Sequence, residues 1–219
     1  MIVRMASVSM RCQAMNDVEI RRGFHRKMLR RHHAREDTLV INELGLNHGE
    51  CRADIAVVNA SLVGYEIKSD CDSLERLAEQ VRLYNSVFDR VSVIVGRRYV
   101  KSIRRYIPGW WGLILSSRGA RGAINFKVLR KPARNEQIDA TSVARLLWRN
   151  EAAELLRRNG LPTDSLRQPR AALYRYLAAT LTLRELRRAV RECLKNRRNW
   201  RCLARPSPRD DLCPPVPRS

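Results

Sequence analysis

Apolar residues near the N-terminus recur at helical spacing. Ile20, Phe24 and Met28 stand four residues apart, and Asn16 with Glu19 forms a capping-box pattern directly before them. The residues between them are largely arginine and lysine. This spacing predicts an amphipathic helix that buries one stripe and presents a basic outer face.

Short runs rich in β-branched residues follow, each bounded by Gly, Asn or Asp, and they predict strands. Four such runs occupy residues 38–44, 51–58, 62–68 and 91–96. A second amphipathic helix, residues 72–88, separates the last two runs, with Asp72 as its N-cap and Glu75 three residues on. Residues 124–129 predict a further strand at the edge of the sheet.

The order helix, three strands, helix, strand predicts an α/β fold, because a parallel last pair of strands needs a crossover of the length that the second helix provides. After Pro132 the composition changes to helical patterns, with Thr182 as a cap of the last helix. The expected organisation is a leader without ordered structure, an α/β core, a basic all-helical region and a Pro-rich disordered tail. These parts span residues 1–15, 16–132, 133–203 and 204–219.

Charge adds a partner to this picture. The chain has 43 Lys and Arg against 22 Asp and Glu, a formal net charge of +21. Residues 97–219 hold 29 of the basic and 9 of the acidic side chains, so the excess lies almost wholly in the second part. Such a balance indicates a polyanionic partner, and nucleic acid is the first candidate.

Cysteine usage and hydropathy exclude other classes. The six cysteines stand far apart without CxxC pairs or histidines at zinc-ligand spacing, which argues against a zinc site and a disulfide framework. No stretch approaches the roughly 20 apolar residues of a membrane helix. We therefore expect a cytoplasmic protein with reduced thiols and no membrane partner.

The two strands at 51–58 and 62–68 bring charged residues together. If residues 59–61 form a three-residue turn, Asp54 lies opposite Glu66, and period two puts Lys68 on the same face. Two carboxylates and an ammonium on one wall suit phosphodiester hydrolysis, in which the carboxylates hold Mg²⁺ and the lysine holds the attacking water. A two-residue turn would shift this register, and an ordinary cross-strand ion pair is the simpler alternative.

The same residues resemble the motifs of the PD-(D/E)XK nuclease superfamily. Asp54 matches its first motif and Glu66-Ile67-Lys68 its second, while Gln80 and Tyr84 resemble the QxxxY motif of the RecB-like branch. The segment "GECRAD" is similar to the approach to the metal ligand in that branch, although a cysteine stands where the branch often has Asp. The likeness covers residues 43–96 and is closest to a poorly characterised bacterial group.

The resemblance implies a restriction-endonuclease-like core and a Mg²⁺-dependent deoxyribonuclease, with Mn²⁺ as a substitute metal. The implied catalytic residues are Asp54, Glu66, Lys68, Gln80 and Tyr84, and the implied metal ligands are Asp54, Glu66 and Glu43. We expect DNA to be held by Arg52, Arg76, Arg187, Arg188 and Arg191. A homodimer would suit the cutting of both strands of a duplex.

Two rival functions stay open at this point. One is a catalytically silent nucleic-acid-binding protein on the same fold, and the other is an RNA-associated basic protein that leaves Asp54, Glu66 and Lys68 unexplained. Trp110 and Trp111 can stack on a base, but a tryptophan pair at the edge of a domain is more often core.

Overall fold

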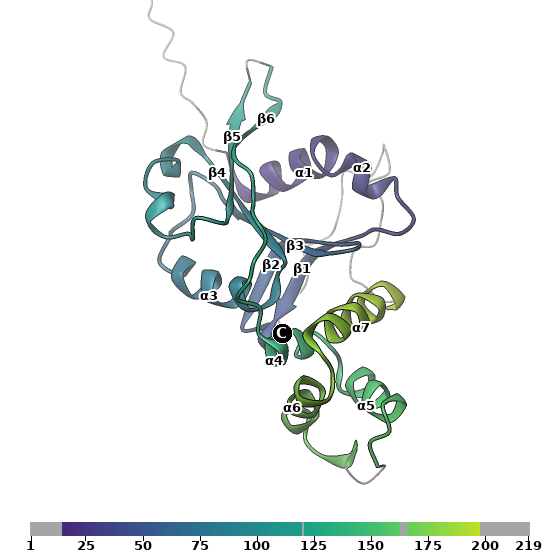
Figure 1. Ribbon diagram of the computed structural model, residues 1–219. Coiled ribbons are helices and arrows are strands. Elements are labelled where there is room, and N and C mark those ends of the chain that lie inside the picture. Colours follow the sequence, from purple (N-terminus) through teal and green to yellow (C-terminus); the bar gives the residue numbers. More distant parts are fainter. Residues whose placement is uncertain (1–14, 120, 163–165, 198–219) are drawn as a thin grey trace, which may run out of the picture.

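The computed structural model describes residues 15–119, 121–162 and 166–197, which form a mixed α/β fold with one six-stranded sheet and seven α-helices (Figure 1). The predicted leader and tail lie outside the described residues, apart from Met15, which is buried. No described helix has the length and apolarity needed to cross a membrane.

The strands of the sheet follow one another in space as they do in the chain. The first three pair antiparallel, β3, β4 and β5 pair parallel, and β6 is antiparallel to β5 at the edge. The strand bounds are Leu39–Leu46 (β1), Cys51–Val58 (β2), Leu62–Lys68 (β3), Arg90–Val95 (β4), Gly112–Arg118 (β5) and Ile124–Arg130 (β6). The predicted order of helix, three strands, helix and strand is confirmed, and β5 was not predicted.

The helices carry the caps that their sequences predict. Asn16 Oδ1 accepts the Glu19 N–H at 2.8 Å before α1, and Thr182 with Glu185 forms a capping box before α7. The α-helices span Asp17–Lys27 (α1), Arg30–His33 (α2), Leu77–Val87 (α3), Ala140–Ala144 (α4), Arg149–Arg158 (α5), Arg170–Thr180 (α6) and Leu183–Asn196 (α7). Three 3₁₀ turns are Asn47–Gly49 (η1), Arg97–Tyr99 (η2) and Ile103–Arg105 (η3).

The second predicted helix begins later than its sequence suggests. It starts at Leu77 rather than at Asp72. The Asp72 carboxylate accepts the Ser69 N–H at 2.7 Å, and the Asp72 backbone carbonyl accepts the Tyr99 hydroxyl, so Asp72 does not cap the helix. The first predicted helix likewise divides, at Met28, into α1 and α2.

One face of the sheet packs against α1. Ile20 and Phe24 of the helix are buried with Ile55, Ile67 and Ile94 of the strands. Of the strand residues, Ile55 and Ile67 are those that period two predicts on the face away from Asp54. Gly23 allows this close packing, since a Cβ there would lie 3.1 Å from the Ile124 Cβ.

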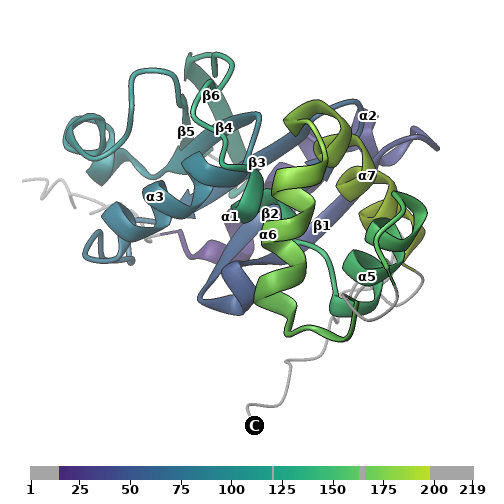
Figure 2. The same cartoon turned by 60° about the horizontal axis from the view of Figure 1, so that its bottom comes forward.

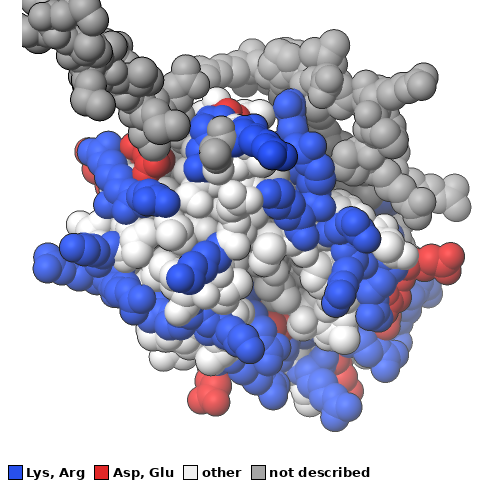
Figure 3. Space-filling view, turned by 90° about the horizontal axis from the view of Figure 1, so that it is seen from above, with Lys and Arg blue, Asp and Glu red and all other residues white. Residues whose placement is uncertain are grey.

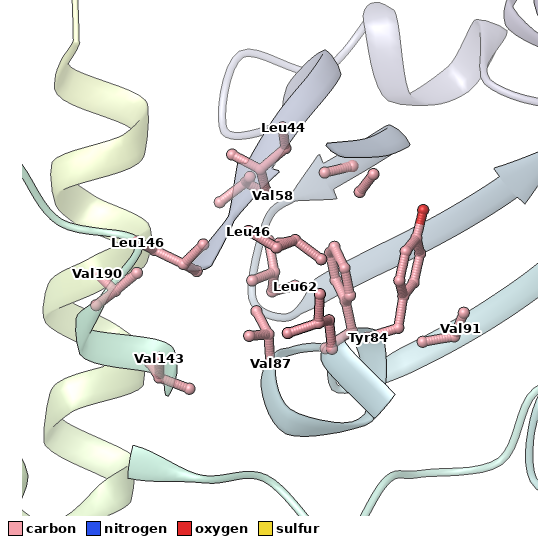
Figure 4. Packing of buried hydrophobic residues seen from close by; sticks show 14 of the residues in the cluster. Leu44, Leu46, Val58, Leu62, Tyr84, Val87, Val91, Val143, Leu146 and Val190 are labelled. Carbon is pink, nitrogen blue, oxygen red and sulfur yellow. The ribbon is translucent and has the colours of Figure 1, made fainter. Parts of the chain in front are cut away.

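The opposite face of the sheet packs against α3 and the C-terminal helices. In Figure 4, Val143, Leu146 and Val190 of the helical region face side chains from β1, β3 and α3. Figure 2 shows α5, α6 and α7 grouped beside the sheet. Buried side chains on both sides of the predicted boundary near residue 132 therefore belong to one hydrophobic cluster.

Candidate functional site

The hairpin of β2 and β3 has the register that a three-residue turn requires. Val58 pairs with Leu62, and regular pairing continues to Ile55 with Tyr65, one step before Asp54 and Glu66. Beyond that step, Asp54 Oδ2 accepts the backbone N–H of Ile67 at 2.6 Å. A side chain thus takes the place of a main-chain acceptor where the two strands separate.

Glu66 lies at the centre of a buried network. Its side chain is 1% exposed, and its carboxylate accepts from three donors. Lys68 Nζ lies 2.8 Å and Gln80 Nε2 2.6 Å from Oε1, while the Tyr84 hydroxyl donates to Oε2. The Gln80 and Tyr84 side chains reach Glu66 from one face of α3, four residues apart, as the motif spacing implied.

Asp54 belongs to a second group of charges, which Arg21 of α1 holds together. Arg21 Nη2 lies 2.9 Å from Asp54 Oδ1 and 3.0 Å from Asp17 Oδ2, and its Nη1 lies 2.8 Å from Glu43 Oε1. Glu43 has a φ of 56°, in the left-handed region that a side chain rarely adopts. One guanidinium therefore contacts three carboxylates, two of them from different strands.

Burial dominates the electrostatics of this region. Burial and the neighbouring Glu66 carboxylate raise the pKa of Asp54 to about 8, against the opposing effect of the Arg21 guanidinium. Burial, together with the Glu66 and Asp54 carboxylates, raises the pKa of the Tyr84 phenol well above its usual value. The same causes raise the pKa of the Cys51 thiol to about 11. Tyr84 is thus held as a hydrogen-bond donor.

The structure brings Asp54, Glu66, Lys68, Gln80 and Tyr84 together at this end of the sheet, with Glu43 reaching Asp54 through Arg21. The three implied metal ligands do not converge, because Glu43 and Asp54 are bound to Arg21 and Glu66 to its own donors. Within the described ranges, no group of three or more His, Cys, Asp and Glu side chains is placed to hold a metal ion. These residues do not fit a magnesium centre as they lie, and Mg²⁺ binding stays a prediction.

The five arginines expected to hold DNA differ in their surroundings. Arg52 and Arg76 are exposed, and Arg188 is exposed while paired with Glu192 four residues on. Arg191 is half-buried beside Arg187, and burial lowers the pKa of both. Arg187 forms an ion pair with Asp89, whose other oxygen accepts the buried Leu62 N–H at 2.7 Å. Arg187 therefore fastens α7 to the sheet.

Sequence reasoning missed Arg21. The only local signal was Asp17 four residues before it, which is the ordinary spacing of a helical ion pair. Its contacts with Glu43 and Asp54 join residues far apart in the chain, so no motif spacing contains them.

A basic face lies over α1, α2 and the hairpin of β5 and β6. Lys27 Nζ donates to Asn125 Oδ1 at 2.8 Å and Arg118 pairs with Glu19 at 2.7 Å, so the helix and the hairpin are tied together. Seen from this side, Lys and Arg cover much of the surface and acidic groups are few (Figure 3). We call this surface the α1–hairpin face and define it by the exposed residues Arg22, Arg26, Arg30, Arg31, Arg121 and Lys127.

The comparisons with known proteins point to a phage family. The family model of bacteriophage P4 protein cII matches residues 13–211. Protein cII of Enterobacteria phage P4 is 29% identical over 161 residues, which are 74% of this chain and 60% of that protein. The chain thus spans about three fifths of that relative's length.

Among solved structures, the SPO1766 protein of unknown function from Silicibacter pomeroyi has a TM-score of 0.41 and 18% identity, and the match covers 66% of this chain and 93% of that chain.

These matches overturn the nuclease assignment. Neither the family model nor the phage relative is described as a nuclease, and the cII family model covers nearly the whole chain, whereas the motif resemblance covered only residues 43–96. Membership of the PD-(D/E)XK superfamily is therefore wrong, and with it the interpretation as a hydrolase and Mg²⁺-dependent deoxyribonuclease. The motif misled because Asp54, Glu66 and Lys68, whose charges pair with Arg21 or with each other, have the same spacing as catalytic residues.

Proposed function

The chain belongs to the bacteriophage P4 protein cII family, and we propose that it acts as a nucleic-acid-binding protein, with DNA as its partner. The α1–hairpin face carries this proposal. Its six exposed basic side chains come from segments about 90 residues apart in the chain, the helices α1 and α2 and the β5–β6 hairpin, and α1 is packed against that hairpin. Phosphate groups of a nucleic acid are the polyanion that such a surface fits.

The cations of this face are available to a partner. Within the described part of the chain, none of the six forms an ion pair with a carboxylate, in contrast to Arg187, Arg188 and Arg197 of the C-terminal region. Arg22 and Arg26 stand one helical turn apart on the solvent side of α1. Their charges are therefore not neutralised before DNA arrives.

The ion pairs of Arg21 support this face from behind. Arg21, next to Arg22, ties α1 to β1 and β2 through Glu43 and Asp54. The proposed role of these ion pairs is to fix the position of α1, and with it the spacing of the basic side chains. A restriction-endonuclease-like core, which is more specific than a mixed α/β fold, stays a prediction about topology and says nothing about activity.

The test is the salt dependence of DNA binding. We expect the full chain to bind a labelled duplex in fluorescence anisotropy, with affinity falling steeply from about 50 to 200 mM salt. Replacing Arg22, Arg26 and Arg31 by alanine removes three cations, and each lost phosphate contact reduces the slope of log affinity against log salt by about 0.9.

A matched control removes the same charge elsewhere. Arg157, Arg158 and Arg188 are exposed and already paired with Glu154 or Glu192, so under this proposal none of them, Arg188 included, is a DNA contact. Their replacement by alanine is therefore expected to leave the slope nearly unchanged. An equal loss in both triple variants would show that net charge, and not this face, determines affinity. A wild-type chain that fails to bind duplex at 50 mM salt would refute DNA binding itself.

A further inference from the structure

The connection from β4 to β5 is part of an unusual stretch of sequence. Residues 97–135 contain eleven Lys and Arg and no Asp or Glu. The stretch supplies the hairpin part of the α1–hairpin face, but it also includes η2 and η3, which lie outside that face. The basic side chains of η2 and η3 therefore need an account of their own.

This connection is firmly held. Tyr99 and Ile103 are buried, and Trp111 is fully buried, as expected of a tryptophan at the edge of a core. The Arg98 N–H donates to Asp70 Oδ1 at 3.0 Å, and Arg130 donates from Nε to the Trp111 carbonyl at 2.6 Å. Side chains displayed by this segment are thus presented by a rigid support.

The exposed part combines charge with an aromatic ring. Arg104 and Arg105 of η3 are exposed, and Tyr106 directly after them is 48% exposed although Ile103 and Ile107 beside it are buried. Arg130 donates from Nη2 to the Pro108 carbonyl at 3.0 Å, and the Ala133 N–H donates to the Trp110 carbonyl at 2.8 Å. These two hydrogen bonds hold the chain after β6 against the β4–β5 connection, so the exposed Lys131 and Arg134 lie along that connection.

We propose that Tyr106 is a stacking site for an unpaired base and that Arg104 and Arg105 hold the flanking phosphates, which makes this segment a contact surface for single-stranded DNA. An exposed ring beside fixed cations is the combination that binds single strands, because every base offers a face for stacking while the backbone needs charge. A duplex keeps the faces of its bases stacked inside, so it offers phosphates and base edges but no base face for an aromatic ring. This inference rests on the proposed DNA binding and names a strand form for it.

The experiment compares single-stranded and duplex DNA of one sequence on the full chain, by fluorescence anisotropy. Replacing Tyr106 by alanine is expected to weaken single-strand binding at least about fivefold, the lower end of the effect of losing one base–aromatic stack, with duplex binding changed less than twofold. Tyr106→Phe keeps the ring and is expected to bind like the wild type. Tyr176→Ala, which removes a 42% exposed ring from α6, is the matched control and is expected to change neither affinity.

The outcomes separate this inference from the proposed function. If the wild type binds both forms of DNA and Tyr106→Ala binds the single strand normally, the stacking site is wrong while DNA binding stands. An equal loss for duplex and single strand, or a loss of single-strand binding in Tyr176→Ala, would also overturn it. A wild type that binds neither form refutes the proposed function first.

Discussion

Arg21 on α1 donates two hydrogen bonds to Asp54 on β2: its Nη2 lies 2.9 Å from the carboxylate Oδ1 and its Nη1 lies 2.6 Å from the backbone carbonyl oxygen. The pair joins the helix that carries part of the α1–hairpin face to the strand that carries the buried charges. Both side chains are largely shielded from water. If either one is removed, water therefore cannot fully replace it as the partner of the other.

Removing the Arg21 guanidinium should destabilise the fold. Arg21→Ala leaves Asp54, Asp17 and Glu43 without their common partner, and we expect a loss of about 2–3 kcal/mol, as for hydrogen bonds to partly buried charged groups. Urea denaturation measures this loss. The neighbouring Arg22→Ala, at an exposed position, should change the free energy of unfolding by no more than about 0.5 kcal/mol.

Magnesium should compete with Arg21. Glu43 and Asp54 are acidic oxygen donors of the kind that Mg²⁺ prefers, but the guanidinium occupies both. We expect isothermal titration with Mg²⁺ to give tighter binding to the folded Arg21→Ala variant than to the wild type. Equal or weaker binding to the variant would argue against any cation site at these two carboxylates.

Arg187 should contribute to stability rather than mainly to DNA affinity. Arg187→Ala leaves the buried Asp89 carboxylate without its cation, so we expect a loss of about 1.5–3 kcal/mol in denaturation. Arg188→Ala, one position on and exposed, is the control and should unfold like the wild type. Normal stability of the Arg187 variant would return this side chain to the DNA-binding candidates.

His25 should make stability depend on pH. Its Nδ1 lies 2.9 Å from His33 Nε2 and its Nε2 2.7 Å from Asn42 Oδ1, and burial lowers its pKa from 6.5 to about 4. In the unfolded chain the imidazole becomes protonated as the pH falls below about 6.5. In the folded chain it becomes protonated only near pH 4. The stability due to neutral His25 is therefore present above pH 6.5 and lost as pH falls toward 4, by up to about 3 kcal/mol.

The His25→Gln variant checks this dependence, since it should flatten the curve of unfolding free energy against pH between 6.5 and 4. His48→Asn is the control: it removes an exposed histidine at a positive φ that asparagine also adopts. A curve for His25→Gln as steep as that of the wild type would assign the acid sensitivity to other groups.

Gly64 should be intolerant of a side chain. A Cβ there would lie 2.9 Å from a ring carbon of Phe88, the fully buried residue that ends α3, so Gly64→Ala should cost about 1–3 kcal/mol through overpacking. Gly109→Ala offers a control, because nothing lies within 4 Å of a Cβ at that position. Thermal or urea unfolding of the two variants measures the difference.

Local patterns in the sequence determined much of this protein. The capping boxes of α1 and α7, the bounds of β2 and β3, and the pairing of Val58 with Leu62 follow from interactions within a few residues or across one turn. Such interactions are fully specified by residue type and spacing. The face on which Ile55 and Ile67 are buried follows equally from period two.

Only the tertiary structure decided how the charges are used. Strand β5 was missed because a continuous apolar run after two tryptophans has no alternation to identify it, and both of its faces are covered. Arg21 meets Glu43 and Asp54, and Arg187 meets Asp89, across 22 to 98 residues of chain. The sequence alone does not distinguish a charged residue that binds a phosphate or a metal from one that pairs with another side chain. The difference depends on which opposite charge the fold brings within about 3 Å of it.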